Sequence, residues 1–178
     1  MQNFEFFSII FAIITFFHYL SLKLQSRYQI YTIYFDKKAF TVHFIFTSLL
    51  WIVWLILFFI LSPNNPSIGL PFYNQFFVPM GIFTSMVGLI LIIWSGCLLG
   101  LRRAWGIRYF EKNLKNKIER RGPYKYLNNP IYDGFVLYSL GKALTNNSFI
   151  YLLISLECYL FFNVFLSSFE NKEVYKKF

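Results

Sequence analysis

The feature that most constrains the fold of this chain is its division into long apolar runs. A helix crosses the hydrocarbon core of a bilayer with roughly 20 consecutive apolar residues. Residues 6–22, 39–61 and 80–101 form three such runs, and the third contains no charged residue. Only 14% of the chain is charged, against about 25% in a typical soluble domain, so the sequence predicts an integral membrane protein.

Two shorter apolar runs follow towards the C-terminus. Residues 131–144 include Asp133 and Lys142, and residues 148–169 form the last run. The polar residues TNNS at their junction favour a tight turn between two helices. The predicted fold is therefore all-α, with about five transmembrane helices, of which the last two form a C-terminal helical hairpin.

The distribution of Lys and Arg predicts how these helices are oriented. The connections 23–38 and 102–125 contain four and nine basic residues, and the tail 172–177 contains three, whereas the connection 62–77 contains none. Because basic residues accumulate on the cytoplasmic side, we expect a non-cytoplasmic N-terminus and a cytoplasmic C-terminus. Such loops suit an anionic cytoplasmic face, in either the bacterial inner membrane or the endoplasmic reticulum.

The remaining composition argues against two kinds of site. Because the basic residues lie at membrane boundaries, the net charge of +9 does not indicate nucleic-acid binding. Cys97 and Cys158 fall in separate apolar runs with no His or Cys at ligand spacing, so no metal site is expected. His18 and His43 have no carboxylate or second histidine at helical spacing, and we expect them to be interfacial side chains without a role.

The third apolar run contains small residues at helical spacing. Gly96 and Gly100 lie four residues apart, and Thr84 and Gly88 show the same spacing earlier in the run. Small residues four positions apart share one face of a helix and let another helix approach closely. These pairs predict a helix-packing surface, and admission of a ligand close to the backbone is the alternative.

The segment RRGPYKYLNNPIYDG, residues 120–134, lies between the third and fourth runs and is rich in turn-forming residues. Gly122 and Pro123 predict a turn. Pro130 suits the first turn of a helix and Asn129 is a favourable N-cap, so we expect the fourth helix to begin here. Unpaired N–H groups at such a helix end attract an anionic group.

Three tyrosines of this segment strengthen the expectation of a binding site. Tyr124, Tyr126 and Tyr132 are expected to surround the helix end with aromatic faces, which attract a cation or stack on a base. The alternative is that the tyrosines belong to an interfacial belt and that Asn129 is an ordinary helix cap.

The pattern GPYKYLNNPIYDG at 122–134, followed by YSLGKALTNNS, a last apolar run and the tail ENKEVYKKF, resembles the membrane-embedded methyltransferases. This family includes isoprenylcysteine carboxyl methyltransferases and phospholipid N-methyltransferases. The resemblance begins near LGLRRAWG, which contains Trp105, and covers about the last 80 residues. It implies a methyltransferase-like cofactor-binding region with the hairpin at 102–178, after an N-terminal three-helix membrane region at 1–101.

The resemblance also implies a cofactor and an acceptor. Enzymes of this family enclose S-adenosylmethionine on the cytoplasmic side and take their acceptor from the bilayer, as a lipid or a lipidated molecule. The reaction transfers the sulfonium methyl group to a nucleophile, and the protein positions the reactants and excludes water. By position, the resemblance assigns cofactor binding to Gly122, Pro123, Tyr124, Asn129, Pro130, Tyr132, Gly134 and Glu170.

The match favours the amine of an ethanolamine phospholipid as the acceptor. Asn129 stands where carboxyl methyltransferases have His, whereas the phospholipid enzymes commonly have Asn-Pro. A lipid ammonium group must lose a proton before methylation, so Glu170 or Asp133 is expected to be catalytic and to accept it, directly or through water. One or both acids of the family's Glu pair are replaced in this chain, and Glu173 is the alternative to Glu170.

Three other interpretations stay open. A prenylated cysteine carboxylate would need no base, because that nucleophile is already an anion. A scaffold or partner subunit that kept the fold and lost activity would account for the replaced acids. The C-terminal module of membrane steroid reductases also has a Pro-x-Tyr turn before a final hairpin, but Ile131 and Phe135 stand where that module has Asn and Glu.

Overall fold

The computed structural model describes residues 2–61, 67–69, 73–111 and 119–166. Its α-helices are α1 (Gln2–Tyr28), α2 (Ile30–Phe35), α3 (Ala39–Leu61), α4 (Val78–Leu99), α5 (Leu101–Ala104), α6 (Pro130–Asn146) and α7 (Phe149–Cys158). Shorter 3₁₀ turns cover Asp36–Lys38, Ile107–Tyr109 and Gly122–Lys125, and π-helical segments cover Tyr73–Phe77 and Tyr159–Leu166. Every named element is helical, which confirms the all-α prediction.

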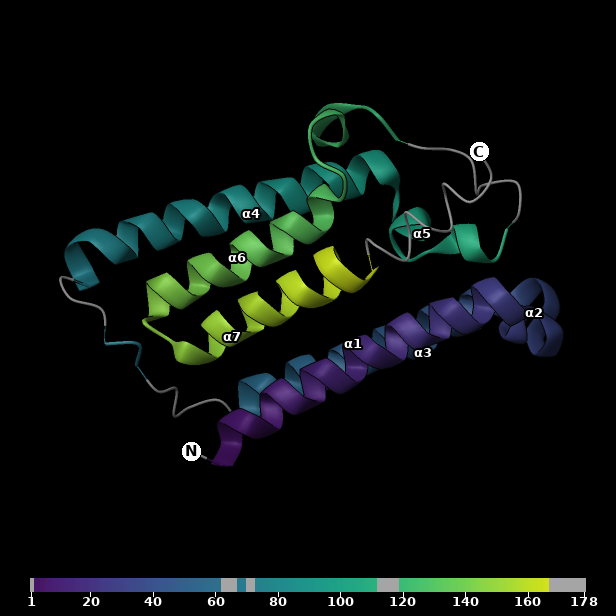
Figure 1. Ribbon diagram of the computed structural model, residues 1–178, viewed down its shortest axis with the longest axis horizontal. Coiled ribbons are helices and arrows are strands. Elements are labelled where there is room, and N and C mark those ends of the chain that lie inside the picture. Colours follow the sequence, from purple (N-terminus) through teal and green to yellow (C-terminus); the bar gives the residue numbers. More distant parts are fainter. Residues whose placement is uncertain (1, 62–66, 70–72, 112–118, 167–178) are drawn as a thin grey trace.

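The long helices lie side by side in the order α4, α6, α7, with the α1 and α3 pair alongside (Figure 1). α6 packs between α4 and α7, and α1 packs against both α3 and α7. The short helix α5 and the 3₁₀ turn Gly122–Lys125 both pack at α4. The segment with the predicted site residues therefore lies at one end of the α4–α6 pair.

α6 and α7 form the hairpin that the sequence predicts. α6 ends at Asn146, and Asn147 adopts the left-handed backbone conformation with a φ of 46°. The N–H of Ser148 then donates to the carbonyl of Ala143 at 3.0 Å, which satisfies a carbonyl group of the last helical turn. α7 begins directly afterwards at Phe149, so the two helices run antiparallel.

α4 and α6 approach so closely that their contact requires glycine. A Cβ atom on Gly88 would lie 2.7 Å from the carbonyl oxygen of Gly134, and a Cβ atom on Gly81 would lie 2.7 Å from the carbonyl oxygen of Gly141. The two glycines that each helix contributes to this contact are seven residues apart, or about two helical turns. Backbone thus lies directly against backbone at two points along the pair.

The predicted packing surface is therefore confirmed at Gly88, whereas Gly96 and Gly100 do not pack closely against a described helix. A Cβ atom on Gly96 or Gly100 would have no described neighbour within 4 Å, and Gly100 ends α4 with a φ of 80°. Thr84 is bonded to its own helix, because its hydroxyl donates to the Met80 carbonyl at 2.8 Å. The predicted four-residue spacing differs from the observed one because α4 and α6 make their close backbone contacts every seven residues, which is about two helical turns.

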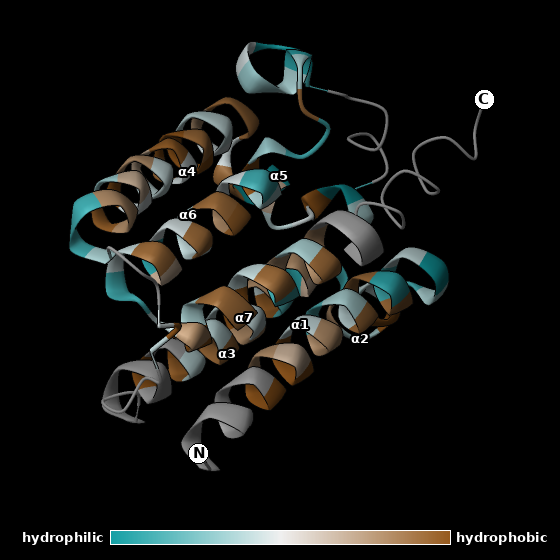
Figure 2. Ribbon diagram, turned by 60° about the vertical axis from the view of Figure 1, so that its left-hand side comes forward, coloured by the Kyte–Doolittle hydropathy of each residue, from teal (hydrophilic) through white to brown (hydrophobic). Residues whose placement is uncertain are grey.

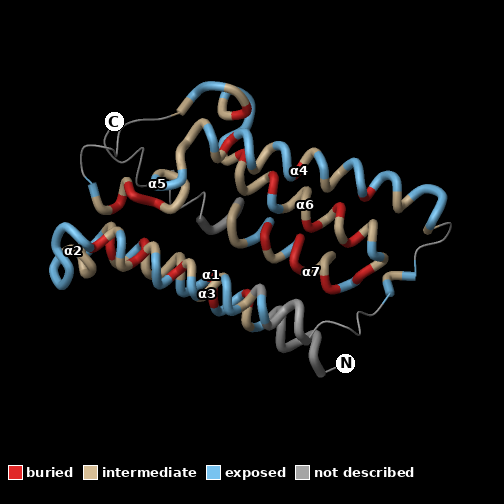
Figure 3. Tube along the Cα trace, turned by 180° about the vertical axis from the view of Figure 1, so that it is seen from behind, coloured by how far each residue is buried: buried red, intermediate tan, exposed pale blue. Residues whose placement is uncertain are grey.

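Two helical segments of the described residues are long and apolar enough to cross a membrane, Ile9–Tyr28 and Tyr73–Leu99. Large apolar side chains on both are exposed, among them Phe16, Phe83 and Ile90. α4 is strongly hydrophobic in Figure 2 and largely exposed in Figure 3, as expected of a helix that faces lipid. The count of about five spans and the orientation of the termini stay predictions.

A buried glutamine organises the connection between α1 and α3. Gln25 is 1% exposed, and its Oε1 accepts the backbone N–H of Tyr31 at 2.9 Å. Its Nε2 donates to Thr32 Oγ1 at 2.6 Å and to the Tyr109 carbonyl at 3.5 Å. Gln25 thus connects α1 both to the start of α2 and to the segment that follows α5.

The two histidines come together, although we predicted separate interfacial side chains. The ring centroids of His18 on α1 and His43 on α3 lie 5.6 Å apart, and His43 is completely buried. Helical spacing rules do not reveal such a pair, because it depends on how α3 folds back against α1 and not on a pattern within one helix.

Candidate functional site

The turn that precedes α6 has the conformation expected of its Gly-Pro sequence. Gly122 has a φ of 56°, in the left-handed region that glycine adopts without strain. The N–H groups of Tyr126 and Leu127 both donate to the carbonyl of Pro123, at 3.0 and 2.9 Å. These bonds confirm the turn that Gly122 and Pro123 predict.

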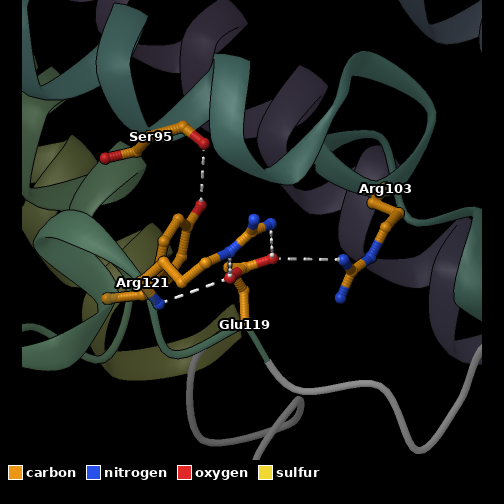
Figure 4. Close-up of polar contacts among 5 residues, drawn as sticks. Ser95, Arg103, Glu119 and Arg121 are labelled. Atoms are coloured by element: carbon orange, nitrogen blue, oxygen red, sulfur yellow. Dashed lines mark hydrogen bonds and ion pairs between the residues drawn. The ribbon is translucent and has the colours of Figure 1, made fainter.

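The turn packs against the C-terminal end of α4. A Cβ atom on Gly122 would lie 2.6 Å from Leu98 Cδ1 and 3.2 Å from the Trp94 ring, and Pro123 is buried. The Tyr124 hydroxyl donates to the backbone carbonyl of Ser95 at 3.4 Å, a contact drawn in Figure 4. Glycine suits this position for its backbone conformation, and a larger side chain here would also require the end of the Leu98 side chain to move.

Ser95 is a further polar residue at this contact that the sequence reasoning missed. It is completely buried, and its Oγ has no hydrogen-bond partner among the described residues. Buried hydroxyl groups are normally hydrogen-bonded, so a buried one without a partner is a candidate ligand contact. Its position seven residues after Gly88, on the buried face of α4, is the signal that could have drawn attention to it.

α6 begins where the sequence predicts, but its first turn offers fewer free donors than expected. The N–H groups of Tyr132 and Asp133 both donate to the Asn129 carbonyl, at 2.9 and 3.1 Å. The Asn129 side chain makes no capping hydrogen bond, and the buried Pro130 has no N–H. The helix dipole still favours an anion here, while much of the local donor capacity is used internally.

The three tyrosines of the segment have different surroundings. The Tyr132 ring stacks on Phe162 with centroids 5.0 Å apart and an interplanar angle of 15°, whereas Tyr124 contacts Ser95 as described above. Tyr126 is 79% exposed. Gly134 lies inside the α4–α6 contact, where a Cβ atom would be 2.8 Å from the Gly88 carbonyl oxygen. The predicted roles of these residues in cofactor binding stay predictions.

Of the predicted acids Asp133, Glu170 and Glu173, the structure describes Asp133. Asp133 lies in the first turn of α6 and is partly buried. Glu170 and its alternative Glu173 lie outside the described residues. Within the described part of the chain, no group of three or more His, Cys, Asp or Glu residues is placed to hold a metal ion.

A carboxylate next to the turn connects it to α5. Glu119 Oε1 accepts a hydrogen bond from Arg121 Nε at 2.8 Å, and Glu119 Oε2 lies 3.2 Å from Arg121 Nη2 and 3.8 Å from Arg103 Nη1 (Figure 4). The hydrogen bond from the Arg121 side chain is the main cause that lowers the pKa of Glu119 to about 2. The same contact raises the pKa of Arg121. The sequence signal for this contact is an acid followed directly by two arginines, Glu119-Arg120-Arg121.

Comparisons with known proteins identify the region that contains this site. A model of the phospholipid methyltransferase family matches residues 76–178, which is 103 of the 178 residues. Comparisons with curated proteins and with solved structures give no significant match. The match begins before the predicted boundary at residue 101, and it contains α4 together with α6 and α7. Because it covers more than half of the sequence, the chain belongs to the phospholipid methyltransferase family.

Proposed function

We propose that this protein is an S-adenosylmethionine-dependent methyltransferase that methylates the amine of an ethanolamine phospholipid. The observation that carries the proposal is the family match over 76–178, which contains the predicted turn, the start of α6 and the hairpin. Membership of a methyltransferase family supports the reaction class, and the lipid substrate of that family supports an acceptor from the bilayer. The choice of ethanolamine rests on the Asn129-Pro130 sequence.

The contact between α4 and the turn fits a polar cofactor. S-adenosylmethionine supplies an electrophilic methyl group on a sulfonium centre when it is bound. The unpartnered Ser95 Oγ beneath Tyr124 can bind a polar atom of this molecule, and Tyr124 offers an aromatic face. Asn129 and the start of α6 suit its carboxylate, because the positive end of a helix dipole lies there.

The residues around the site would prepare the acceptor for transfer. A phospholipid can reach the end of α4 along the exposed apolar side chains of that helix, without leaving the bilayer. Its ammonium group must become neutral, and Asp133 on the first turn of α6 is the described carboxylate that we assigned to this step, with Glu170 as the candidate in the tail. Burial of the turn against α4 helps to exclude water.

The transfer of a labelled methyl group by membranes that contain the protein tests this function. We expect label in the ethanolamine phospholipids of the lipid extract. Label in base-labile protein esters would instead indicate a carboxyl methyltransferase. Absence of both, together with no binding of S-adenosylmethionine, would indicate a scaffold that kept the fold without the activity.

A matched pair of tyrosine variants tests the placement of the site. Tyr124→Phe removes a hydroxyl that donates to the Ser95 carbonyl, and Tyr73→Phe removes one that donates to the Thr145 carbonyl at the opposite end of α6. We expect Tyr124→Phe to lower methyl transfer about tenfold, since about 1.4 kcal/mol of lost interaction changes a rate by that factor. Tyr73→Phe should keep the wild-type rate. Equal rates for both variants would mean that the site lies elsewhere.

A further inference from the structure

Arg121 lies directly before the turn of the proposed site, and one side of its guanidinium group is occupied. Its Nε and Nη2 donate to the two carboxylate oxygens of Glu119, at 2.8 and 3.2 Å. A guanidinium group has five N–H bonds, so three remain, and those on Nη1 have no partner in the described part of the chain. The side chain is 73% exposed. Arg121 is therefore a cation that Glu119 holds in place and that keeps donors for a ligand.

Two further contacts fix this guanidinium group next to the turn. The N–H of Tyr124 donates to the Arg121 carbonyl at 3.2 Å, so the backbone of Arg121 is part of the turn. The Glu119 carboxylate also lies 3.8 Å from Arg103 Nη1 on α5, and Figure 4 shows it between the two guanidinium groups. Two arginines around one carboxylate leave a net positive charge, which attracts an anion to this place.

The two arginines lie where the apolar surface of α4 ends. Exposed apolar side chains extend along this helix from Phe83 to Trp94, and both of these residues are more than half exposed. The Trp94 ring lies 3.2 Å from the position of a Cβ atom on Gly122, the residue that follows Arg121. Arg103 belongs to α5, which begins directly after α4. A lipid whose acyl chains lie along α4 therefore has its headgroup beside Arg121 and Arg103.

The chemistry of a lipid headgroup fits this cluster. The planar guanidinium fork matches the geometry of phosphate oxygens and binds two of them at once. In an ethanolamine phospholipid, two methylene groups connect the phosphodiester to the amine. A phosphodiester on Arg121 therefore leaves the amine within a short reach of Tyr124, which lies in the same turn. That turn is also where the proposed methyl donor binds.

We propose that Arg121 and Arg103 bind the phosphodiester of the lipid acceptor and so position its amine at the turn. Glu119 acts as a positioning residue, because it holds the Arg121 fork against the turn. This inference rests on the proposed function and adds to it the contact that recognises the phosphate of the acceptor. Other glycerophospholipids carry the same phosphodiester, so they compete with the acceptor for this contact.

Arg121→Gln tests the proposal through the kinetics of methyl transfer. The full-length protein is assayed in mixed micelles of dodecyl maltoside, a detergent without phosphate, so phosphatidylethanolamine supplies the only phosphodiester. We expect the KM for this lipid to rise about tenfold, the lower end for hydrogen bonds to a charged group, because Arg121 is largely exposed. The kcat should stay within about twofold of wild type. Arg121→Lys keeps the charge without the fork and should give an intermediate KM.

Arg102→Gln is the matched control on α5. Arg102 is 69% exposed and makes one ion pair, with Glu111 at 3.1 Å, so the substitution removes the same charge from a comparable environment. It should keep the wild-type KM. An equal rise in KM for Arg102→Gln would mean a general electrostatic attraction and would overturn the proposed contact. An unchanged KM for Arg121→Gln, or a loss confined to kcat, overturns it as well and leaves the proposed function standing.

Competition in the wild-type protein tests the same contact without a variant. Phosphatidylglycerol carries the phosphodiester and no amine, so it should inhibit competitively against phosphatidylethanolamine. Diacylglycerol has the same chains without the phosphate and should not inhibit. Equal inhibition by the two lipids would contradict recognition of the phosphate. Inhibition by inorganic phosphate as strong as that by phosphatidylglycerol would assign the contact to a soluble anion and overturn the lipid as its ligand.

Native mass spectrometry separates this proposal from the proposed function, because it needs no turnover. Wild-type protein in dodecyl maltoside should retain phosphatidylethanolamine and phosphatidylglycerol in preference to diacylglycerol, and Arg121→Gln should lose that preference. A wild-type protein that shows the preference and transfers no methyl group would contradict the proposed function while supporting the phosphodiester contact. A wild-type protein without the preference overturns the contact.

Discussion

Single polar residues hold the turn of the candidate site in place. Tyr124 bonds to the α4 backbone, while Glu119 lies next to the turn and contacts Arg103 of α5. Glu119 keeps a side-chain exposure of 9%, against 73% for Arg121, so its carboxylate is the more enclosed member of the pair. The position of the turn thus depends on electrostatic contacts as well as on the backbone preferences of Gly122 and Pro123.

The ion pair at Glu119 predicts a pH window for stability. Its pKa is lowered from 4.5 in the unfolded chain to about 2 in the folded protein. The contribution to stability is therefore fully present above about pH 4.5, and it disappears as the pH falls towards 2. We expect Glu119→Gln to lower the free energy of unfolding above pH 5, and the difference from wild type to vanish near pH 2.

Glu111→Gln is the control for this measurement. It removes the ion pair with Arg102, whose two side chains are 69% and 49% exposed, so the effect should be small at every pH. Denaturant unfolding in detergent micelles across this pH range measures both variants. A Glu119→Gln difference that stays constant with pH would show that the ion pair does not stabilise the fold.

At the residue scale, the sequence predicts backbone better than side-chain contacts. The turn at Gly122 and Pro123 and the helix start at Pro130 follow from local chemistry, and both were predicted. The missing side-chain cap of Asn129 and the exposure of Tyr126 were not, because each depends on the neighbouring elements. Ser95 was missed because its seven-residue spacing from Gly88 marks a buried face of α4 only once the partner helix is known.

At the scale of elements, the contact between α4 and α6 sets the positions of the residues that form the candidate site. Both helices contribute residues to it, since α4 contacts the turn and α6 begins where the turn ends. Their separation is set by the glycine contacts near Gly88 and Gly134 and near Gly81 and Gly141. A change in helix separation would therefore also displace Ser95 relative to Tyr124.

A pair of glycine substitutions on one helix tests this contact. A Cβ atom on Gly88 would lie 2.4 Å from the backbone nitrogen of Tyr138, so Gly88→Ala forces the helices apart. We expect a loss of about 1–3 kcal/mol in the free energy of unfolding, the usual range for overpacking. Gly96→Ala has no described neighbour within 4 Å and should be neutral or stabilising by up to about 1 kcal/mol. Thermal unfolding in detergent measures both, and equal effects would contradict the close contact.

The hairpin shows which elements the sequence predicts well. The polar residues between the last two apolar runs led to the correct turn, because Asn favours the left-handed conformation that Asn147 adopts. The seven-residue glycine spacing was missed, since it becomes visible only when two helices are compared in antiparallel register. Element type follows from local pattern, while the surface that each helix buries depends on its partner.

For the whole molecule, the pattern of apolar runs predicts the all-α fold and the family resemblance predicts the reaction class. The family match over 76–178 confirms the suspected family. The N-terminal helices lie outside the match, and their buried polar groups, including Gln25 and His43, had no signal in the sequence. His18 and His43 become neighbours only because α3 folds back along α1.

The most direct test of the proposed function identifies the product of the purified protein. Phosphatidylethanolamine nanodiscs are incubated with the protein and with S-adenosylmethionine that carries a deuterated methyl group, and the lipid is analysed by mass spectrometry. We predict a labelled methyl group on the headgroup nitrogen, in an amount that depends on Tyr124 and not on Tyr73. If the protein is shown to bind S-adenosylmethionine and the headgroup still carries no label, that result would contradict a lipid amine as the acceptor.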